Sequence, residues 1–230
     1  MPEAALNLTR GCGNPTGFAG LRSGEVVVDF GCGGGIDVVL AAHKVGLDGR
    51  VAGVDFAPEM IERANRAVTE AGLAGGNVEL HVADLANTPL VDGFADVVIS
   101  NCVINLCPDK AEIYREACRV LKAGGRLAIS DIVLTEDIGP ELRERFRSTW
   151  SGCLGGAITE DDYWQTVSEA GFYEVRIVNR HLLTPDELAA MACCPGEEFT
   201  PAPAPAQEEL AQVQGKVSSV KFTGIKPRRA

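Results

Sequence analysis

Cysteines next to glycines are the residues of this sequence with the clearest capacity for chemistry. Cys12 lies in the stretch TRGCGNPTGFAG, and Cys153 lies in WSGCLGGA. A third stretch carries the adjacent pair Cys193 and Cys194 before Pro-Gly. A cysteine is usually a small buried hydrophobe, but glycine neighbours disfavour a helix interior or a core strand. Because thiolates bind soft, thiophilic centres, the three stretches predict thiol-bearing loops around such a centre.

A glycine-rich turn between a strand and a helix is the second chemical signal. In VVVDFGCGGGID, Asp29 ends the expected strand and a helix opens behind the turn. The turn contains Gly31, Cys32, Gly33 and Gly35. Glycine lets the backbone turn sharply and lie against a ligand, and a small side chain fits between the glycines. Asp55 ends the next strand, where an acid can accept hydrogen bonds from both ribose hydroxyls, so the pattern predicts an adenosine cofactor.

The position of Asp29 separates two kinds of adenosine cofactor. A dinucleotide loop reads G-x-G-x-x-G and places a pyrophosphate at a helix N-terminus. Here the glycines are spaced G-x-G-x-G, and the Asp29 carboxylate two residues upstream would repel a pyrophosphate. The same carboxylate suits the cationic, amine-bearing end of S-adenosylmethionine, which we therefore expect as the cofactor.

Strands and helices alternate over the part of the sequence that carries the glycine turn. Short apolar, β-branched runs are typical of buried strands, and the amphipathic stretches between them are typical of helices. This alternation indicates an α/β fold with a doubly wound, mostly parallel sheet. The expected strands are 25–30, 50–56, 77–85, 94–101 and 126–134, and helices are expected after the glycine turn and over 58–72 and 109–121, the last ended by the glycines of 123–125.

The pattern changes after residue 134. Charged and amphipathic stretches predict further helices, and PAPAPAQEE (201–209) is typical of an exposed, extended linker. The expected elements are helices over 139–150, 160–172 and 184–192, a sixth strand over 173–180 and a closing strand over 216–227. We therefore expect a cofactor-binding domain with substrate loops over 1–180, and a small C-terminal appendage over 181–230.

The composition argues against several other functions. A net charge of −11 opposes binding to a nucleic-acid backbone. No apolar run is long enough for a membrane span, and the start of the sequence lacks the pattern of a signal peptide. The eight cysteines form no C-x-x-C pair and only three histidines are present, so zinc patterns fail and no metal site is expected. We expect a cytoplasmic monomer with reduced thiols.

The stretch DFGCGGG resembles the first motif of the class I S-adenosylmethionine methyltransferases. VADLANTPL is similar to the motif whose acid lies beside the adenine amine, FADVVISN to the fourth-strand motif, and LKAGGRLAISD to the loop and fifth strand. The resemblance covers nearly all of residues 20–180. It implies a Rossmann-like sheet of seven strands, the last of them antiparallel. The residues that it adds to the expected cofactor site are Phe56, Asp84, Leu85 and Asn101.

Four stretches together resemble the arsenite S-adenosylmethionine methyltransferases: GCGNPTG, SNCVINLCPDK, LKAGGRLAISDIV and GCLGGA. The resemblance implies methyl transfer to trivalent arsenic, with Cys12 and Cys153 as arsenic-binding thiolates and a third from Cys193 or Cys194. Glutathione or another cellular thiol is expected to supply and re-reduce the arsenic. Since trivalent arsenic held by thiolates keeps a lone pair, no general base is required.

Two other functions stay open from the sequence. A methyltransferase for a small organic acceptor would need a base near its nucleophile, and no histidine lies in the expected loops. A thiol-based metalloid-binding protein on a degenerate scaffold is suggested by the short segment before Gly11, where members of the family carry a helical segment. The intact glycine turn argues against that alternative. We expect Cys102 and Cys107, which flank VINL, to be core or wall residues.

Overall fold

A single seven-stranded sheet organises the described part of the chain. The computed structural model describes residues 13–149, 152–192 and 207–228. Its strands are β1 (Val26–Phe30), β2 (Arg50–Asp55), β3 (Val78–Val82), β4 (Ala95–Asn101), β5 (Leu121–Leu134), β6 (Tyr173–Leu182) and β7 (Val217–Ile225), in the order β3-β2-β1-β4-β5-β7-β6. Strands β1 to β5 pair in parallel, and β7 runs antiparallel to β5 and β6. The doubly wound, mostly parallel fold predicted from the sequence is confirmed.

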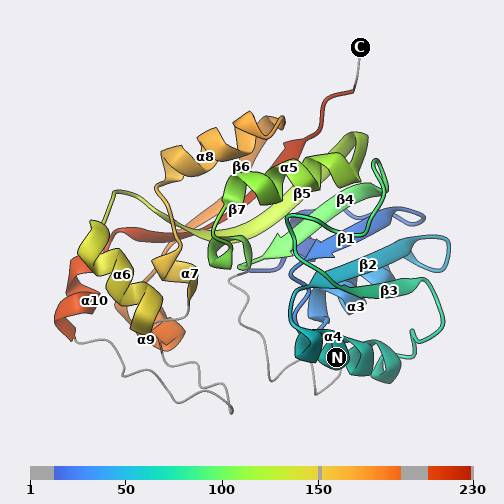
Figure 1. Ribbon diagram of the computed structural model, residues 1–230, viewed down its shortest axis with the longest axis horizontal. Helices are drawn as coiled ribbons and strands as arrows, with labels where there is room; N and C mark the ends of the chain where they lie inside the picture. Colours follow the sequence, from blue (N-terminus) through green and yellow to red (C-terminus); the bar gives the residue numbers. More distant parts are fainter. Residues whose placement is uncertain (1–12, 150–151, 193–206, 229–230) are drawn as a thin grey trace.

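Helices cover both faces of this sheet. They are α2 (Pro15–Phe18), α3 (Ile36–Val45), α4 (Pro58–Glu70), the 3-10 turn η1 (Ile104–Leu106), α5 (Lys110–Val120), α6 (Pro140–Thr149), α7 (Gly152–Gly155), α8 (Glu160–Glu169), α9 (Pro185–Ala192) and α10 (Gln207–Val213). Figure 1 shows α5 and α8 on one face and α3 and α4 on the other, with α6, α7, α9 and α10 gathered at one end of the strands. None of the helices in the described ranges is long and apolar enough to cross a membrane.

The sequence pattern of α4 explains why it packs against the sheet. Pro58 begins the helix, where its fixed backbone angle suits the first turn. The buried residues recur at helical spacing, namely Ile61, Ala64, Ala67 and Val68. Ile61, Ala67 and Val68 join the core cluster that also contains Val51 of β2 and Val38 of α3. The charged residues therefore face outward, and the helix covers the sheet beside the glycine turn.

Three boundaries differ from those expected. The helix α5 ends at Val120 and Leu121 is already extended, so the glycine cap expected at 123–125 is wrong and these residues belong to β5. The expected linker 201–209 overlaps α10, which begins at Gln207. Cys153 lies in the short helix α7 and not in a flexible loop, because its glycine neighbours permit a single helical turn packed on η1.

The strand β7 comes from the segment expected as an appendage. It pairs with β5 from Leu134↔Val217 to Arg126↔Ile225, and with β6 on its other side. Val220 and Phe222 are buried in the same cluster as core residues of β1 and β4. Residues 217–225 are therefore an interior part of the sheet.

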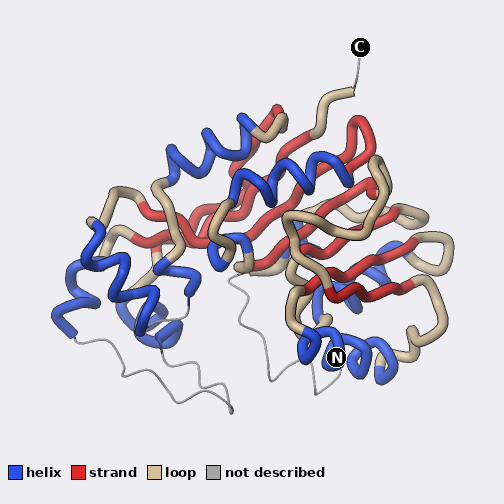
Figure 2. The backbone as a smooth tube through the Cα atoms, viewed as in Figure 1, coloured by secondary structure: helices blue, strands red, loops and turns tan. Residues whose placement is uncertain are grey.

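The carboxyl ends of β1, β2, β4 and β5 meet at one edge of the sheet, because these strands are parallel neighbours. Asn101, the last residue of β4, is paired in register with Ser130 of β5. Figure 2 shows the strands in red, with the helices in blue on both sides. In an open α/β sheet, ligands bind outside this edge, and the sequence predicts the chemistry-bearing residues at the same edge.

Candidate active site

The glycine turn is folded back onto the end of β2. The amide groups of Gly31 and Cys32 both donate to Val54 O, at 2.8 and 3.0 Å. Gly31 and Gly33 have positive φ angles of 76° and 49°, which favour glycine. The Cys32 side chain is buried, and burial raises the pKa of its thiol. Cys32 therefore fills space beneath the turn, while the glycine backbone faces the edge of the sheet.

Asp55 is oriented by two backbone amides. Its Oδ2 accepts from Gly33 N at 2.9 Å, and its Oδ1 accepts from Ala57 N at 3.0 Å. Each carboxylate oxygen keeps a second lone pair for a ligand. The next residue, Phe56, is 70% exposed and offers an apolar ring beside that carboxylate. An acid with an adjoining aromatic surface fits a ribose and its base, as the sequence predicts.

Asp29 is a buried acid that has no ion-pair partner within the described ranges. Its side chain is 2% exposed. Burial first, and then the nearby carboxyls of Asp37 and Asp55, raise its pKa well above the ordinary value of 3.8. A buried carboxylate without a cation is costly unless a ligand supplies the charge. This arrangement fits the cationic, amine-bearing end of S-adenosylmethionine.

Asn101 connects the two sides of this acidic region. Its Nδ2 donates to Asp37 Oδ2 at 3.0 Å and to Gly13 O at 2.9 Å. Its Oδ1 is buried without a hydrogen-bond partner in the described structure. An acceptor of this kind normally has a partner, and an ammonium group of a ligand would provide one. Asn101 is therefore placed where the sequence predicts a cofactor residue.

The absence of a side chain at Gly13 is explained by Ser130. A Cβ at Gly13 would lie 2.0 Å from Ser130 Oγ and 2.8 Å from Ser130 Cβ. Backbone packed this closely on β5 tolerates only glycine. The segment after Cys12 is thereby held against the ends of β4 and β5.

Gly13→Ala is expected to destabilise the fold by about 1–3 kcal/mol, because the new methyl group overlaps Ser130. It should also break the bond from Asn101 to Gly13 O and weaken cofactor binding. The added change Ser130→Gly removes the clash and should restore most of both losses, which denaturation and calorimetry of the two variants would measure. A double variant no better than Gly13→Ala would contradict this explanation.

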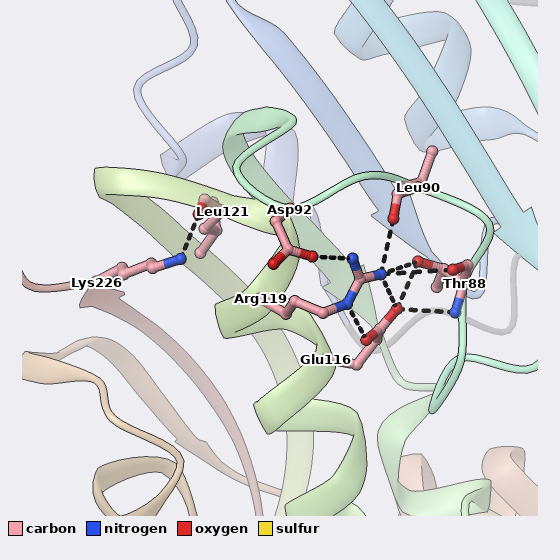
Figure 3. A network of polar contacts seen from close by, with 7 residues as sticks. All are labelled: Thr88, Leu90, Asp92, Glu116, Arg119, Leu121 and Lys226. Carbon is pink, nitrogen blue, oxygen red and sulfur yellow. Dashed lines mark hydrogen bonds and ion pairs between the residues drawn. The ribbon is translucent and has the colours of Figure 1, made fainter.

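A polar network fixes the loop that carries Asp84 (Figure 3). Asp84 follows β3, and its Oδ1 accepts from Ala86 N at 2.9 Å. Further along the loop, Thr88 N and Oγ1 both donate to Glu116 Oε1, at 2.8 and 2.7 Å. Arg119 donates to Glu116, to Asp92 Oδ1 at 2.6 Å and to Leu90 O at 2.8 Å. The loop is thus anchored to α5 over most of its length.

The ionised form of Glu116 is maintained by this network. Burial opposes ionisation, but the hydrogen bonds from Arg119 and Thr88 hold the pKa of its carboxyl below the ordinary value. Leu85 is buried in the core, so its side chain anchors the same loop and only its backbone can face a ligand. Asp84 is exposed, as an acid that contacts an adenine amine must be.

Arg119→Ala is expected to destabilise the protein by about 1–3 kcal/mol, because Glu116 keeps its charge and loses its partner. The freed loop should also lower cofactor affinity several-fold, without changing the reaction of bound substrate. Arg66→Ala on the exposed side of α4 is the matched control, and it should change neither quantity. Equal cofactor affinity in all three proteins would show that the network does not position the loop.

The turn after β4 carries another cysteine, Cys102. Cys102 follows Asn101 with a φ of 58°, a left-handed conformation that costs energy in a residue other than glycine. Its amide donates to Ser130 O at 2.8 Å, and its side chain is 5% exposed. Cys102 takes part in a disulfide bond. Cys102 is buried in a core cluster, as the core or wall position expected from the sequence implies, but its strained backbone and its disulfide were not predicted.

Cys153 lies directly against this turn. Its Sγ donates to Cys102 O at 3.1 Å, and its side chain is 8% exposed. The sequence missed Cys102 because the contact joins residues 51 positions apart. Cys107 and Cys118 are partly buried free thiols, and burial raises the pKa of Cys107 to about 11. Both pack against the main core cluster, and Cys107 thus lies at the core or wall position expected from the sequence.

Proteins of similar sequence show the family to which this chain belongs. A family model described as a methyltransferase domain matches residues 21–171, which is more than half of the chain. The chain belongs to this methyltransferase family. It is 44% identical over 171 residues to an arsenite methyltransferase of Halobacterium salinarum, covering 74% of this chain and 43% of that protein. It is 33% identical over 169 residues to the human arsenite methyltransferase, covering 69% of this chain and 44% of that protein.

A solved structure is also similar to this methyltransferase. It is that of an arsenic(III) S-adenosylmethionine methyltransferase from Chlamydomonas reinhardtii, with a TM-score of 0.81 and 28% identity. The alignment covers 99% of this chain and 71% of that one. The methyltransferase spans less than half the length of the two relatives named above. The resemblance to arsenite methyltransferases that the motifs indicate is confirmed.

Several residues expected at the site of this methyltransferase lie outside the described residues. They are Cys12, Cys193 and Cys194. Among the described ones, Asp29, Asp55, Asn101 and the glycine turn lie around the carboxyl ends of β1, β2 and β4. Asp55 is bonded to the glycine turn through Gly33 N, and Asn101 is bonded to Asp37 on α3, with Cys102 next to it in the chain.

Proposed function

We propose that this methyltransferase transfers a methyl group from S-adenosylmethionine to trivalent arsenic held by protein thiolates. The observation that carries the proposal is the contact between the glycine turn (residues 31–35, the cofactor turn) and the turn after β4 that carries Cys102 (residues 102–105, the thiol turn). A Cβ at Gly31 would lie 2.4 Å from both methyl carbons of Val103, the residue after Cys102. The turn that carries Cys102 thus packs directly on the expected methyl-donor site, and Cys153 lies against that turn. The names and similarity of the relatives support the same acceptor.

The protein residues bind and orient both reactants. Asp29 and Asn101 Oδ1 would hold the ammonium end of the cofactor, and Asp55 would hold the ribose hydroxyls. The chemistry supplied by bound S-adenosylmethionine is an electrophilic methyl group, which the lone pair of trivalent arsenic attacks with no proton to lose. Cys102 and Cys153 would hold the arsenic, since thiolates are soft ligands. Positioning in line is then the main catalytic contribution.

A third thiolate is expected from the segments outside the described residues. Cys12 is the first candidate, because Gly13 beside it is fixed against Asn101 and Ser130. Cys193 and Cys194 stay as alternatives from the sequence. An arsenic atom held by three thiolates, or by two and an external thiol, keeps the lone pair that the transfer needs.

An external thiol such as glutathione has two roles in this proposal. It delivers trivalent arsenic as a thiol complex, and it supplies two electrons after methylation, since transfer of a methyl cation raises the arsenic from oxidation state III to V. Two thiols become one disulfide in that reduction. The disulfide at Cys102 supports the need for such a reductant, because it must be opened before the sulfur can bind arsenic.

A methylation assay tests the proposal. The purified chain is incubated with arsenite, glutathione and S-adenosylmethionine, and the arsenic products are separated and quantified. Methylated arsenic that depends on the protein and on both small molecules is the expected result. A chain that binds the cofactor but gives no methylated arsenic would overturn the proposal and favour a small organic acceptor. Arsenic binding in calorimetry without cofactor binding would instead favour a metalloid-binding protein.

A further inference from the structure

A buried chain of polar groups runs from α5 through α8 to β5. Tyr114 OH donates to Tyr163 OH at 2.6 Å, and Tyr163 OH donates to Asp131 Oδ2 at 3.0 Å. Asn105 Nδ2 donates to the other carboxylate oxygen, Oδ1, at 2.8 Å. None of the four residues is more than 2% exposed. The chain of hydrogen bonds therefore ends on Asn105, in the 3-10 turn η1 that follows Cys102.

Both ends of the thiol turn are bonded to consecutive residues of β5. At its start, Cys102 N donates to Ser130 O at 2.8 Å. At its end, Asn105 Nδ2 donates to Asp131 Oδ1 and to Ile132 O, the latter at 2.6 Å. The turn between these bonds contains the left-handed Cys102, whose conformation persists only where the surroundings enforce it. The two hydrogen bonds donated by the Asn105 side chain help to hold Cys102 in that conformation.

Asp131 is a poor choice for stability alone. It is 0% exposed and makes no ion pair within the described ranges. Burial raises the pKa of its carboxyl to about 6, although hydrogen bonds from Ile132 and Tyr163 oppose the shift. Removing a carboxylate from water costs free energy that an apolar side chain would not cost. A buried carboxyl group of this kind more often serves to position its hydrogen-bond partners.

We propose that Asn105 and Asp131 are positioning residues that hold the Cys102 turn against Cys153 in the arrangement that binds trivalent arsenic. The inference rests on the proposed function for its substrate, but its geometry stands on the hydrogen bonds above. The two residues act through the backbone of the turn and touch neither the cofactor nor the arsenic. They therefore govern arsenic affinity and leave cofactor affinity unchanged.

The test uses phenylarsine oxide, a trivalent arsenical that binds paired thiols, on the full chain reduced with a phosphine. Asn105→Leu removes the amide that donates to Asp131 and Ile132. Its affinity for phenylarsine oxide should fall about tenfold or more, the equivalent of one lost charge-assisted hydrogen bond. The KM for arsenite should rise in parallel, while the dissociation constant for S-adenosylmethionine stays the same.

Two variants at Asp131 separate positioning from general packing. Asp131→Asn can still accept from Asn105 and can turn its own amide toward Tyr163 OH, so arsenical affinity should be retained. Asp131→Leu should lose it as Asn105→Leu does, and it replaces Asn105→Leu if that variant does not fold. Tyr114→Phe is the matched control. It removes a buried hydroxyl group from the same series of hydrogen bonds but leaves the bonds among Tyr163, Asp131 and Asn105 intact. The affinity for the arsenical should therefore not change.

Each result decides the inference. Native affinity in both Leu variants overturns it, and so does a loss in Tyr114→Phe as large as in Asn105→Leu, because the network then acts only through stability. A parallel loss of cofactor affinity in Asn105→Leu also overturns it. If the native chain binds phenylarsine oxide through its thiols but methylates no arsenic, the proposed function fails while the positioning inference stands. If the native chain binds no arsenical, both fail.

Discussion

Cys153→Ser is expected to lower the rate of arsenic methylation roughly 100-fold, which corresponds to about 2.7 kcal/mol in the barrier. A serine hydroxyl is a hard, neutral oxygen at neutral pH and cannot replace a soft thiolate. The change removes one ligand but leaves the contact of α7 with the thiol turn nearly unaltered in size. The affinity for S-adenosylmethionine should stay the same. Product speciation and cofactor calorimetry measure the two quantities.

Cys118→Ser is the control for this prediction. Cys118 is a partly buried thiol on α5, and its sulfur faces Gly171, away from the thiol turn. The same atom exchange there should leave methylation unchanged. Full activity in Cys153→Ser would mean that the arsenic is bound by other sulfurs. Equal losses in both variants would point to a general effect of removing a thiol.

Asp29→Asn is expected to weaken S-adenosylmethionine binding by about 10- to 100-fold, because a charge-assisted contact to the ammonium end is replaced by a neutral one. The same change should stabilise the protein without cofactor at neutral pH. Asp29 is buried, with the carboxyls of Asp37 and Asp55 nearby, and its ionised form is unfavourable in the absence of a cation. Affinity and stability should therefore move in opposite directions.

The pH dependence of that stabilisation has a definite sign. Burial and the neighbouring carboxyls raise the folded-state pKa of Asp29 above its ordinary value of 3.8. The native protein then holds this proton more tightly than the unfolded chain, so its stability from this group is full below pH 3.8 and is lost as the pH rises through the raised pKa. The advantage of Asp29→Asn should be largest at neutral pH and shrink on acidification.

Denaturation of the cofactor-free proteins across this pH range measures the effect. Asp48→Asn is the matched control, since Asp48 is an exposed acid in the turn before β2. It should change neither stability nor cofactor affinity. A destabilised Asp29→Asn variant would show that the carboxylate has a structural partner and is not held ready for a cation.

The sheet and the cofactor turn could be predicted from the sequence because their signals are local. The run before Asp29 is apolar and β-branched, and the glycines that follow reach positive φ angles that other residues avoid. Asp55 ends a second run of the same kind. Since neighbouring parallel strands end at the same edge, the meeting of these acids needs no further information.

The thiol site could be predicted only in part, because it depends on tertiary contacts. Nothing near Cys102 indicates that its backbone is left-handed or that Cys153 lies against it. Glycine neighbours of Cys153 suggested a flexible loop, whereas packing on η1 produces a helical turn. Asp131 looks like an ordinary strand residue until its bond to Asn105 is seen.

The interior position of β7 has a consequence for the order in which this methyltransferase can mature during synthesis. The residues of β5 that bond the thiol turn pair with Lys221, Val220 and Ser219, in register with Ser130, Asp131 and Ile132. These partners are translated about 90 residues later, after every other strand of the sheet has emerged. Until then β5 has an open edge, β6 has no partner among the described strands, and the turn that carries Cys102 lacks this support. The segments before β7 are made first, so the proposed support of the Cys102 turn is complete only after β7 has been translated and paired.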